Sequence, residues 1–366
     1  MADKKSRSRS VTPGAKGDIT VGSGATSSAI VTVGSNGQVL TADSTQTAGV
    51  KWASAGTTWT NRLLTTTGSK INQIAYNGSN LYVAVGNTGT MYTSPDGITW
   101  TSRTSGFGAQ HIYDVAYGNG LWVAVGSNGV LTTSTDGVTW TARTANMSTN
   151  IIYAVTYANS LWVAVGQGGG ATNTGGIIYS SDGLTWTRKS QTPTVGTAYY
   201  CVVWNGTNWI VGTNLSTNNY LYASTPSGSW TAGNAGGVTN ISLIYWDGTR
   251  HIVLATSGNS GTYYYSTSTT LGTVTGYNTN LAVDATNGTV FTQFSKYYSG
   301  NVYSLGAYLQ SFVPSSTTFI THNTPMLIPT SQLSGNSYFA ATGCALGVFS
   351  TGIIIGDNNG NLWTSF

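Results

Sequence analysis

Charged side chains are scarce in this chain of 366 residues, of which only 7% are Asp, Glu, Lys or Arg. A soluble globular domain averages about 25%. Glutamate is missing altogether, whereas the strand-forming residues Val, Thr, Tyr and Trp are frequent, which argues against a helical or α/β protein. A hydrophobic content of 40%, with 12 Trp and 22 Tyr, is enough for a large core and argues against disorder.

The net charge of +4 belongs to one end of the chain. Five of the fourteen basic residues lie within residues 1–16, and the nine that follow are matched by nine aspartates. We interpret residues 1–16 as a basic anchor tail. The neutral remainder lacks the spread of positive charge that nucleic-acid binding requires, so we expect no specific nucleic-acid partner.

Cysteine is nearly absent, and long apolar runs are lacking. Cys201 and Cys344 are far apart in sequence, so we expect two free thiols and no metal site. No apolar stretch approaches the about 18 residues of a membrane span, and the N-terminal residues lack the apolar segment of a secretory signal. We therefore expect a protein that is made in a cytoplasm, needs no cofactor and does not insert into a membrane.

A short segment recurs along most of the chain. Its clearest copies begin with Ile and end on Val-Ala-Val-Gly, and they occupy residues 71–86, 112–126 and 152–166. Weaker copies begin near residues 199, 241, 281 and 338. A period of 40–45 residues is typical of the blades of a β-propeller.

Each clear repeat has four short strand-forming segments separated by turn residues. In the first repeat these segments are residues 71–76, 81–85, 90–93 and 98–103. The sequence thus predicts an all-β protein with a seven-bladed propeller of four-stranded blades over residues 56–366. Six or eight blades stay open as alternatives, because residues 281–337 match the repeat poorly.

The last repeat lacks a fourth strand, and a matching segment precedes the first repeat. Residues 57–62 resemble residues 98–103, with Trp59 aligned to Trp100 and Arg62 aligned to Arg103. We expect residues 57–62 to complete the last blade, because such pairing covers strand edges that would otherwise be open.

The turn before the fourth strand reads Ser-x-Asp-Gly-x-Thr-Trp in the first three repeats. It resembles the Asp-box (BNR) repeat of sialidase-type propellers, although that motif usually has a spacer between Asp and Gly. The resemblance implies a structural role, in which Asp caps the turn, Gly takes positive φ and Trp packs between blades. The residues concerned are Asp96, Trp100, Asp136, Trp140, Asp182 and Trp186.

Catalytic groups are not gathered in any pattern. A sialidase-type reaction needs an arginine cluster and a Glu-assisted Tyr, and this chain contains no Glu. Asp114 is the one aspartate within a predicted inner strand, and a single carboxyl does not form the pair that other glycosidases use. The three histidines are isolated in sequence. We predict that the protein is not an enzyme and has no catalytic or metal-binding residues.

Residues 17–55 have a different character, rich in Gly, Ser and Thr. They contain Gly37-Gln-Val-Leu-Thr41 and Gly49-Val-Lys-Trp52, which resemble an element of bacteriophage tail fibres and related virion fibres. The resemblance implies a trimeric fibre-type connector that joins the propeller to other virion proteins through residues 1–55. A monomeric strand-rich linker is the alternative.

Together these features predict a bacteriophage virion protein, most simply a tail-fibre or tail-tip protein that attaches to host surface glycan. A head decoration or spike protein and a bacterial carbohydrate-binding adhesion module are the alternatives. Long loops in the third and fourth repeats carry amides and aromatic rings suited to uncharged sugar. The candidate ligand-binding residues are Gln167, Asn173, Gln191, Tyr199, Tyr200, Asn214, Asn218 and Tyr220.

Overall fold

The computed structural model describes residues 69–168, 175–189, 198–236 and 238–246, the strands named below, and residues 248 and 271. Contacts divide the chain into two units, residues 1–59 and Thr60 to Thr364. The described regular structure is β-strand apart from two short 3-10 turns, η1 (Asn87–Gly89) and η2 (Ser127–Gly129). The all-β prediction is confirmed.

The first unit contains two antiparallel strand pairs. β1 (Ile19–Gly24) pairs with β2 (Ser27–Val31), and β3 (Gln38–Ala42) pairs with β4 (Val50–Ser54). The register of the second pair runs from Gln38 opposite Ser54 to Ala42 opposite Val50. The two halves of the fibre-like element are therefore the two strands of one hairpin.

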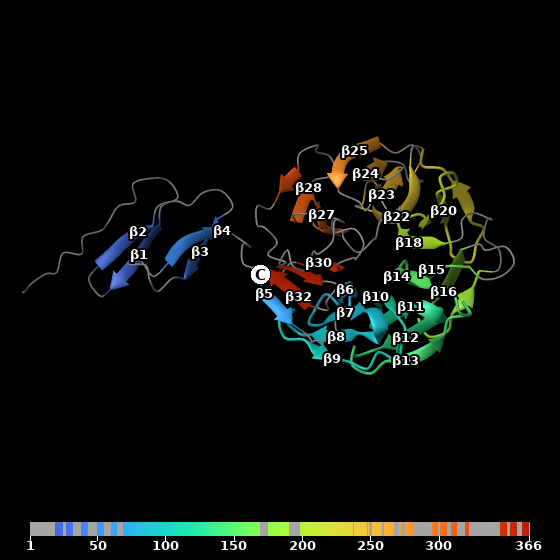
Figure 1. Ribbon diagram of the computed structural model, residues 1–366, viewed down its shortest axis with the longest axis horizontal. Helices are drawn as coiled ribbons and strands as arrows, with labels where there is room; N and C mark the ends of the chain where they lie inside the picture. The colour runs from blue at the N-terminus through green and yellow to red at the C-terminus, as the bar shows by residue number, and fades with distance from the viewer. Residues whose placement is uncertain are drawn as a thin grey trace, which may run out of the picture. The chain divides into compact units, whose positions relative to one another are not determined.

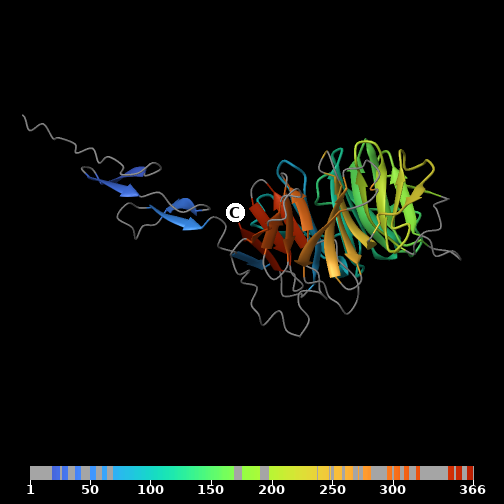
Figure 2. The same ribbon diagram turned by 90° about the horizontal axis from the view of Figure 1, so that it is seen from above.

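The described residues of the second unit form seven four-stranded antiparallel sheets, arranged around a common axis in Figure 1 and seen from the edge in Figure 2. From first to last strand, the first four sheets are β6 (Ile71–Tyr76), β7 (Tyr82–Gly86), β8 (Met91–Ser94) and β9 (Thr101–Ser102); β10 (Ile112–Gly118), β11 (Leu121–Gly126), β12 (Val130–Ser134) and β13 (Thr141–Thr144); β14 (Ile152–Ala158), β15 (Leu161–Gly166), β16 (Gly176–Ser180) and β17 (Thr187–Arg188); β18 (Tyr199–Trp204), β19 (Trp209–Thr213), β20 (Tyr220–Ala223) and β21 (Thr231–Gly233). The other three are β22 (Thr239–Trp246), β23 (His251–Ser257), β24 (Ser260–Ser266) and β25 (Thr275–Leu281); β26 (Ser295–Tyr298), β27 (Asn301–Leu305), β28 (Leu309–Phe312) and β29 (Phe319–Thr321); β30 (Ala345–Phe349), β31 (Gly352–Gly356), β32 (Asn361–Ser365) and β5 (Thr60–Leu63).

The sheets follow the chain in order, and this arrangement is consistent with seven blades. The first strands of neighbouring sheets contact each other from β6 through β10, β14 and β18 to β22, and β30 contacts both β26 and β6. The sixth sheet begins at Ser295, and Leu281, near which the sequence places a sixth repeat, is the last residue of β25. Residue 338 lies outside the described residues.

A segment from early in the chain completes the seventh sheet. β5 pairs antiparallel with β32, in a register that runs from Leu63 opposite Asn361 to Thr60 opposite Thr364. The Arg62 side chain adds a contact across the same pair, because its Nε donates to Thr364 Oγ1 at 3.2 Å. The outer strand of this sheet is therefore about 300 residues away from its partner along the chain.

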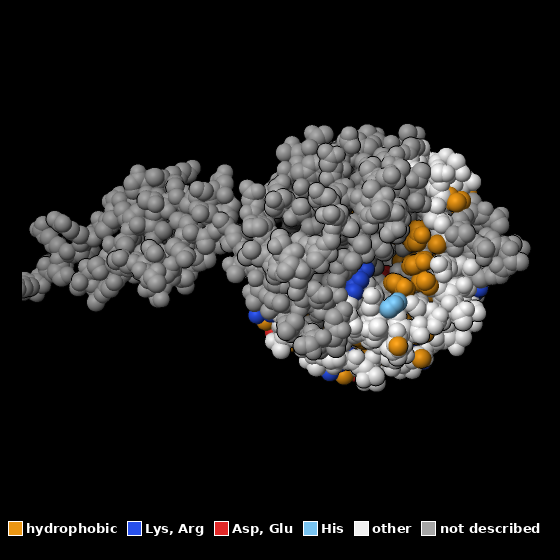
Figure 3. Space-filling model, in the orientation of Figure 1, with side chains coloured by type: hydrophobic (Ala, Val, Ile, Leu, Met, Phe, Trp, Pro, Cys, Tyr) orange, Lys and Arg blue, Asp and Glu red, His pale blue; other side chains and the backbone are white. Residues whose placement is uncertain are grey.

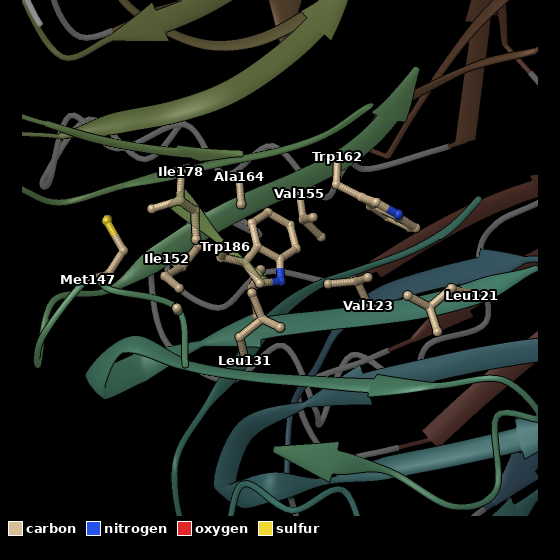
Figure 4. Close-up of a cluster of buried hydrophobic side chains, with 12 residues drawn as sticks. Leu121, Val123, Leu131, Met147, Ile152, Val155, Trp162, Ala164, Ile178 and Trp186 are labelled. Carbon is tan, nitrogen blue, oxygen red and sulfur yellow. The ribbon is translucent and has the colours of Figure 1, made fainter. Parts of the chain in front are cut away.

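The hydrophobic core lies between neighbouring sheets, where alternate strand residues of both meet. Figure 4 shows one such layer, formed by the sheets β10–β13 and β14–β17. Trp162 on β15 and Val123 on β11 are 1% and 0% exposed. The layer also includes Trp186, which follows the turn after β16. Because each layer needs two sheets, no blade has a complete core by itself.

The aspartate-glycine turns between the third and fourth strands are closed by side-chain bonds. Asp136 Oδ1 accepts backbone N–H bonds from Val138 at 2.8 Å and Thr139 at 2.9 Å. Gly137 has φ of 73°, which glycine adopts without steric cost. Trp140 Nε1 donates to the Gly137 carbonyl at 2.9 Å, which fixes the ring over the turn. The structural role expected for these residues therefore has a direct geometric basis.

This turn makes a contribution to stability that depends on pH. The N–H groups of Thr139 and Val138 and the Ser134 hydroxyl stabilise the charged Asp136 carboxylate, and they lower its pKa below the usual 3.8. The pKa of Asp182 is lowered in the same way by Thr185, Leu184 and Ser180. Since the folded-state pKa is below the unfolded one, the stabilisation is fully present above the unfolded pKa and is lost as pH falls through the folded pKa.

We therefore expect the thermal stability of the Asp136→Asn variant to depend less on pH than that of the unaltered protein, at acid pH where the Asp136 carboxylate becomes protonated. An amide oxygen at position 136 still accepts the turn bonds but does not titrate. The measurement is the thermal unfolding temperature at pH 6, 4 and 2.5, together with the carboxyl carbon shift of Asp136 by NMR. A folded-state pKa at or above 3.8 for Asp136 would contradict this account.

Candidate functional site

A β-bulge recurs where the first strand of each clear repeat begins. Ile112 pairs with Gly126 and Asp114 pairs with Val125, which leaves Tyr113 as the extra residue of β10. The same register shift leaves out Tyr153 in β14 and Tyr200 in β18. Since a bulge changes the direction of its side chain, three tyrosines leave the regular alternation at the same level of consecutive blades.

These tyrosines form a continuous aromatic row. The ring centroids of Tyr113 and Tyr153 are 5.7 Å apart, and those of Tyr153 and Tyr200 are 5.2 Å apart. His111 extends the row at one end, with its ring 6.2 Å from that of Tyr113. All four side chains are partly exposed. We call His111, Tyr113, Tyr153 and Tyr200 the aromatic row. Figure 3 shows a group of hydrophobic side chains beside a histidine near the middle of one face.

Neutral polar groups accompany the aromatic row. Gln167 Nε2 donates to the Tyr153 hydroxyl at 3.1 Å, and the Gln167 backbone forms a β-bridge with Ala198. Asn128 Nδ2 donates to Gln110 Oε1 at 2.9 Å, next to His111 in sequence. These amides add hydrogen-bonding capacity to the aromatic surface without adding charge.

The hydroxyls of Tyr153 and Tyr200 stay protonated under ordinary conditions. Burial, together with the neighbouring Tyr200 and Tyr113, raises the pKa of Tyr153 to about 12. Burial also raises the pKa of Tyr200. Tyr153 and Tyr200 therefore present neutral hydroxyls, which can both donate and accept hydrogen bonds, next to their aromatic rings.

Two of the predicted ligand-binding residues, Gln167 and Tyr200, lie at this site. Tyr199 and Tyr220 are buried, at 0% and 4% exposure, and they pack in cores between blades. Asn173 and Gln191 lie outside the described residues.

The two remaining candidates lie in the turn after β19. Asn214 Oδ1 accepts from the Ala198 N–H at 3.4 Å, which ties this turn to the start of β18. Asn218 is exposed and has φ of 55°, and its carbonyl accepts from the Thr213 hydroxyl. Both asparagines therefore take part in hydrogen bonds that involve the turn itself.

Sequence reasoning missed Tyr113, Tyr153 and His111. The available signal was positional, because a Tyr follows the first core residue in three consecutive repeats (Ile112, Ile152 and Tyr199). Recognising it would have required knowing that a bulge directs that residue out of the sheet, which residue spacing alone does not reveal.

Asp114 serves as a link between blades. Its Oδ1 accepts from Gln73 Nε2 at 2.9 Å and from the Val115 N–H at 2.8 Å, and its Oδ2 accepts from the Val155 N–H at 2.9 Å. The carboxylate thus connects the first strands β6, β10 and β14. This structural role accounts for the single aspartate in an inner strand, so no catalytic role is needed to explain it.

The thiol of Cys201 and the imidazole of His251 are buried. Cys201 is a free thiol, and its burial raises its pKa to about 12. His251 is 0% exposed, and its Nε2 lies 3.1 Å from Asn205 Nδ2. The described residues contain no group of three or more His, Cys, Asp or Glu that could hold a metal ion. Nor does this part of the chain include a helix long and apolar enough to span a membrane.

Comparison with known proteins supports the architecture. The family model of the DUF6242 β-propeller domain matches residues 15–150. No match was found among curated proteins. Among solved structures, YCF48 from Cyanidioschyzon merolae is 17% identical, with a TM-score of 0.57 over 84% of this chain and 98% of that chain.

Two further solved structures have the same fold. YCF48 bound to D1 peptide is 14% identical, with a TM-score of 0.61 over 84% of this chain and 94% of that chain. Virginiamycin B lyase from Staphylococcus aureus is 9% identical, with a TM-score of 0.64 over 84% of this chain and 99% of that chain. An enzyme and a peptide-bound protein are thus both similar in structure, so the fold alone does not determine an activity. The chain is an all-β protein with a propeller similar to these.

Proposed function

We propose that this protein is a non-enzymatic attachment module, a virion surface protein of the tail-fibre or tail-tip type that binds host surface glycan with its propeller. Two features support the mounting part of the proposal. The fibre-like element forms a discrete strand pair, β3 with β4, and residues 1–16 carry the excess of positive charge. In this proposal residues 1–55 contact other virion proteins, and the connector forms a homotrimer.

The aromatic row is the observation that carries the binding part of the proposal. Sugars present both apolar ring faces and hydroxyls, and a site for them needs aromatic surface next to neutral donors and acceptors. Tyr113, Tyr153 and Tyr200 supply the rings, and Gln167 supplies an amide held against Tyr153. Three rings in series suit an extended oligosaccharide better than a single sugar.

We expect Tyr153→Ala to weaken glycan binding about tenfold, because it removes the central ring and separates Tyr113 from Tyr200. Tyr153→Phe keeps the ring and loses only the hydroxyl contact with Gln167, so its effect should be smaller, about threefold. The measurement is binding of the full chain to an array of bacterial surface polysaccharides, followed by affinity measurements with those that bind.

Tyr157→Ala is the matched control. Tyr157 lies on the same strand β14, is also partly buried, and packs against Trp162 with ring centroids 5.0 Å apart. It should change thermal stability by at least as much as Tyr153→Ala and leave glycan binding intact. Equal loss of binding in the two variants would mean that stability, and not the aromatic row, explains the result.

A head decoration or spike protein is the second candidate, and it is favoured by the same connector and basic tail. It differs in copy number, since a decoration occurs in many copies per particle and a tail fibre in few. Quantifying the protein in purified particles separates the two. An adhesion module of a bacterium would be absent from particles and present on the cell.

A further inference from the structure

Four Asn-Gly steps lie in the described residues, and each of them carries the same latent reaction. The main-chain nitrogen of the glycine can attack the side-chain amide carbon of the preceding asparagine, because glycine has no Cβ to hinder the approach. The local surroundings of the four steps differ, so the structure decides which of them reacts. The steps are Asn77-Gly78, Asn119-Gly120, Asn128-Gly129 and Asn205-Gly206.

Hydrogen bonds restrain three of these steps. Asn77 Oδ1 accepts backbone N–H bonds from three residues of its own turn, at 2.9 to 3.0 Å, so the turn holds its amide in place. The Gly129 N–H donates to the Asn150 carbonyl at 2.7 Å, so the attacking nitrogen of that step is already engaged. Asn205 is 3% exposed, and its Oδ1 accepts from two N–H groups of its turn at 3.0 and 2.7 Å.

The Asn119-Gly120 step is held in none of these ways. It forms the turn between the paired residues Gly118 and Leu121, with φ of 49° and 73°, the positive values that a type I′ turn requires. Both turn residues are exposed, and a Cβ built on Gly120 would meet no atom within 4 Å. Within the described residues, neither the Asn119 amide nor the Gly120 N–H makes a hydrogen bond. The amide carbon and the nitrogen that attacks it are therefore both accessible.

The third blade contains a matched turn that differs at the attacking residue. Asn159 and Ser160 connect β14 to β15, with φ of 47° and 59°, and both residues are exposed. The side chain of Ser160 hinders the approach of its nitrogen to the preceding amide, whereas Gly120 has no side chain to do so. The two turns thus share exposure and positive φ, and they differ in how easily the nitrogen can attack.

We propose that Asn119 is a site of spontaneous covalent modification, at which the chain converts this asparagine to isoaspartate or aspartate without an enzyme. The Gly120 nitrogen loses its proton and forms a bond to Asn119 Cγ, while the bond from Cγ to Nδ2 breaks and Nδ2 leaves as ammonia after taking up a proton. Water then opens the resulting succinimide ring. Its attack at the main-chain carbonyl of residue 119 gives isoaspartate, its attack at Cγ gives aspartate, and nothing is oxidised or reduced. This proposal does not rest on glycan binding.

The modification changes the contact between the second and third blades. In isoaspartate the main chain runs through the side-chain carbons, which adds one atom to the turn before Leu121. Leu121 is 8% exposed and belongs to the core layer between these blades, where its Cδ2 would lie 2.5 Å from a Cβ built on Gly183. Because the longer turn displaces this side chain, we expect the isoaspartate form to unfold about 2 °C below the unmodified protein.

The test follows the four Asn-Gly steps and Asn159 in the full-length chain during incubation at mildly alkaline pH. Peptide mass spectrometry measures the mass gain of deamidation at each asparagine, and an isoaspartyl methyltransferase identifies the isoaspartate. Asn119 should react first, and about tenfold faster than Asn159, where the serine hinders attack. Its rate should rise with pH, because the attacking nitrogen must lose its proton. In guanidinium chloride the four Asn-Gly steps should react at similar rates.

Two reciprocal variants test the attacking residue. Gly120→Ser copies the turn of the third blade, which has Ser160 at φ of 59°, so the variant should fold and react at Asn119 about tenfold more slowly. Ser160→Gly copies the turn of the second blade and should raise the rate at Asn159 about tenfold.

Three results would overturn the proposal. The first is a rate at any of the three restrained steps that equals the rate at Asn119 in the folded chain. The second is a preference for Asn119 that persists in guanidinium chloride, because the unfolded chain lacks the hydrogen bonds that distinguish the steps. The third is a folded Gly120→Ser variant that reacts at Asn119 as fast as the unaltered chain.

Discussion

A chain that begins at residue 64 will unfold about 5–10 °C below one that begins at Ala55. The shorter chain lacks β5, and the sheet of β30, β31 and β32 is then left with an open edge. Each lost backbone hydrogen bond removes about 0.5–1.5 kcal/mol, and the bond between Arg62 Nε and Thr364 Oγ1 is lost as well. The strand pairing extends over four residue pairs, which brings the total to about 4 kcal/mol.

The comparison separates the strand from the connector. The chain that begins at Ala55 lacks β1 to β4 but retains Thr60 to Leu63, so its unfolding temperature should match that of the full chain within about 2 °C. Differential scanning calorimetry measures the unfolding temperatures of the full chain and of the chains that begin at residues 55 and 64. Equal unfolding temperatures for the chains that begin at residues 55 and 64 would show that β5 contributes nothing to closure.

Gly126→Ala will destabilise the propeller by about 3 kcal/mol or more. A Cβ at this position would lie 2.0 Å from the His111 carbonyl oxygen and 2.9 Å from a ring carbon of Phe107. The carbonyl belongs to backbone that is held by the Ser127 N–H, so it cannot move aside without losing that bond. Gly86 and Gly166 face the carbonyls of Lys70 and Ile151 in the same way, at 2.1 and 2.0 Å.

The matched control is Gly236→Ala, where a Cβ would have no atom within 4 Å. That variant should stay within about 0.5 kcal/mol of the unaltered protein, as expected for a surface substitution. Unfolding in guanidinium chloride gives the free energy of unfolding of both variants, so the two losses of stability can be compared directly. A Gly126→Ala variant as stable as Gly236→Ala would mean that the close approach at the bulge is not a constraint.

Local sequence determined much of the fold in the first three blades. The predicted first strand, residues 71–76, matches β6 residue for residue. The 40-residue spacing of Gly86, Gly126 and Gly166 was recognised as a repeat, and the structure supplies its reason in the close approach of the preceding carbonyl. These blades could be predicted from the sequence because each repeats the same steric requirement for a glycine.

The later blades were harder to predict from the sequence, because they do not repeat that glycine requirement. At the equivalent position of the fourth blade stands Thr213, opposite Tyr199, and not a glycine. The sixth sheet begins at Ser295, fourteen residues after the expected start at Leu281. Sheet pairing over long turns is set by tertiary packing, which single-sequence patterns do not contain.

The candidate site was less predictable than the fold. Loop length and composition indicated Gln167 and Tyr200 as ligand-binding candidates, because long loops of a rigid scaffold are often binding regions. Both residues contact Tyr153 in the structure, and their binding role stays a prediction. The same reasoning included Tyr199 and Tyr220, whose side chains are buried. Adjacent tyrosines on a strand point to opposite sides, and only the bulge at Tyr200 determines which of the two reaches the surface.

The pairing of β5 with β32 also determines when the propeller can close during synthesis of the chain. At a translation rate of about 5–20 residues per second, the about 300 residues between the two strands take about 15–60 s to make. Throughout that time β5 has left the ribosome without its partner, while the blades between them can already pack against one another. The ring can therefore close only after β32, the last strand of the chain, has been made, while earlier blades can already have formed.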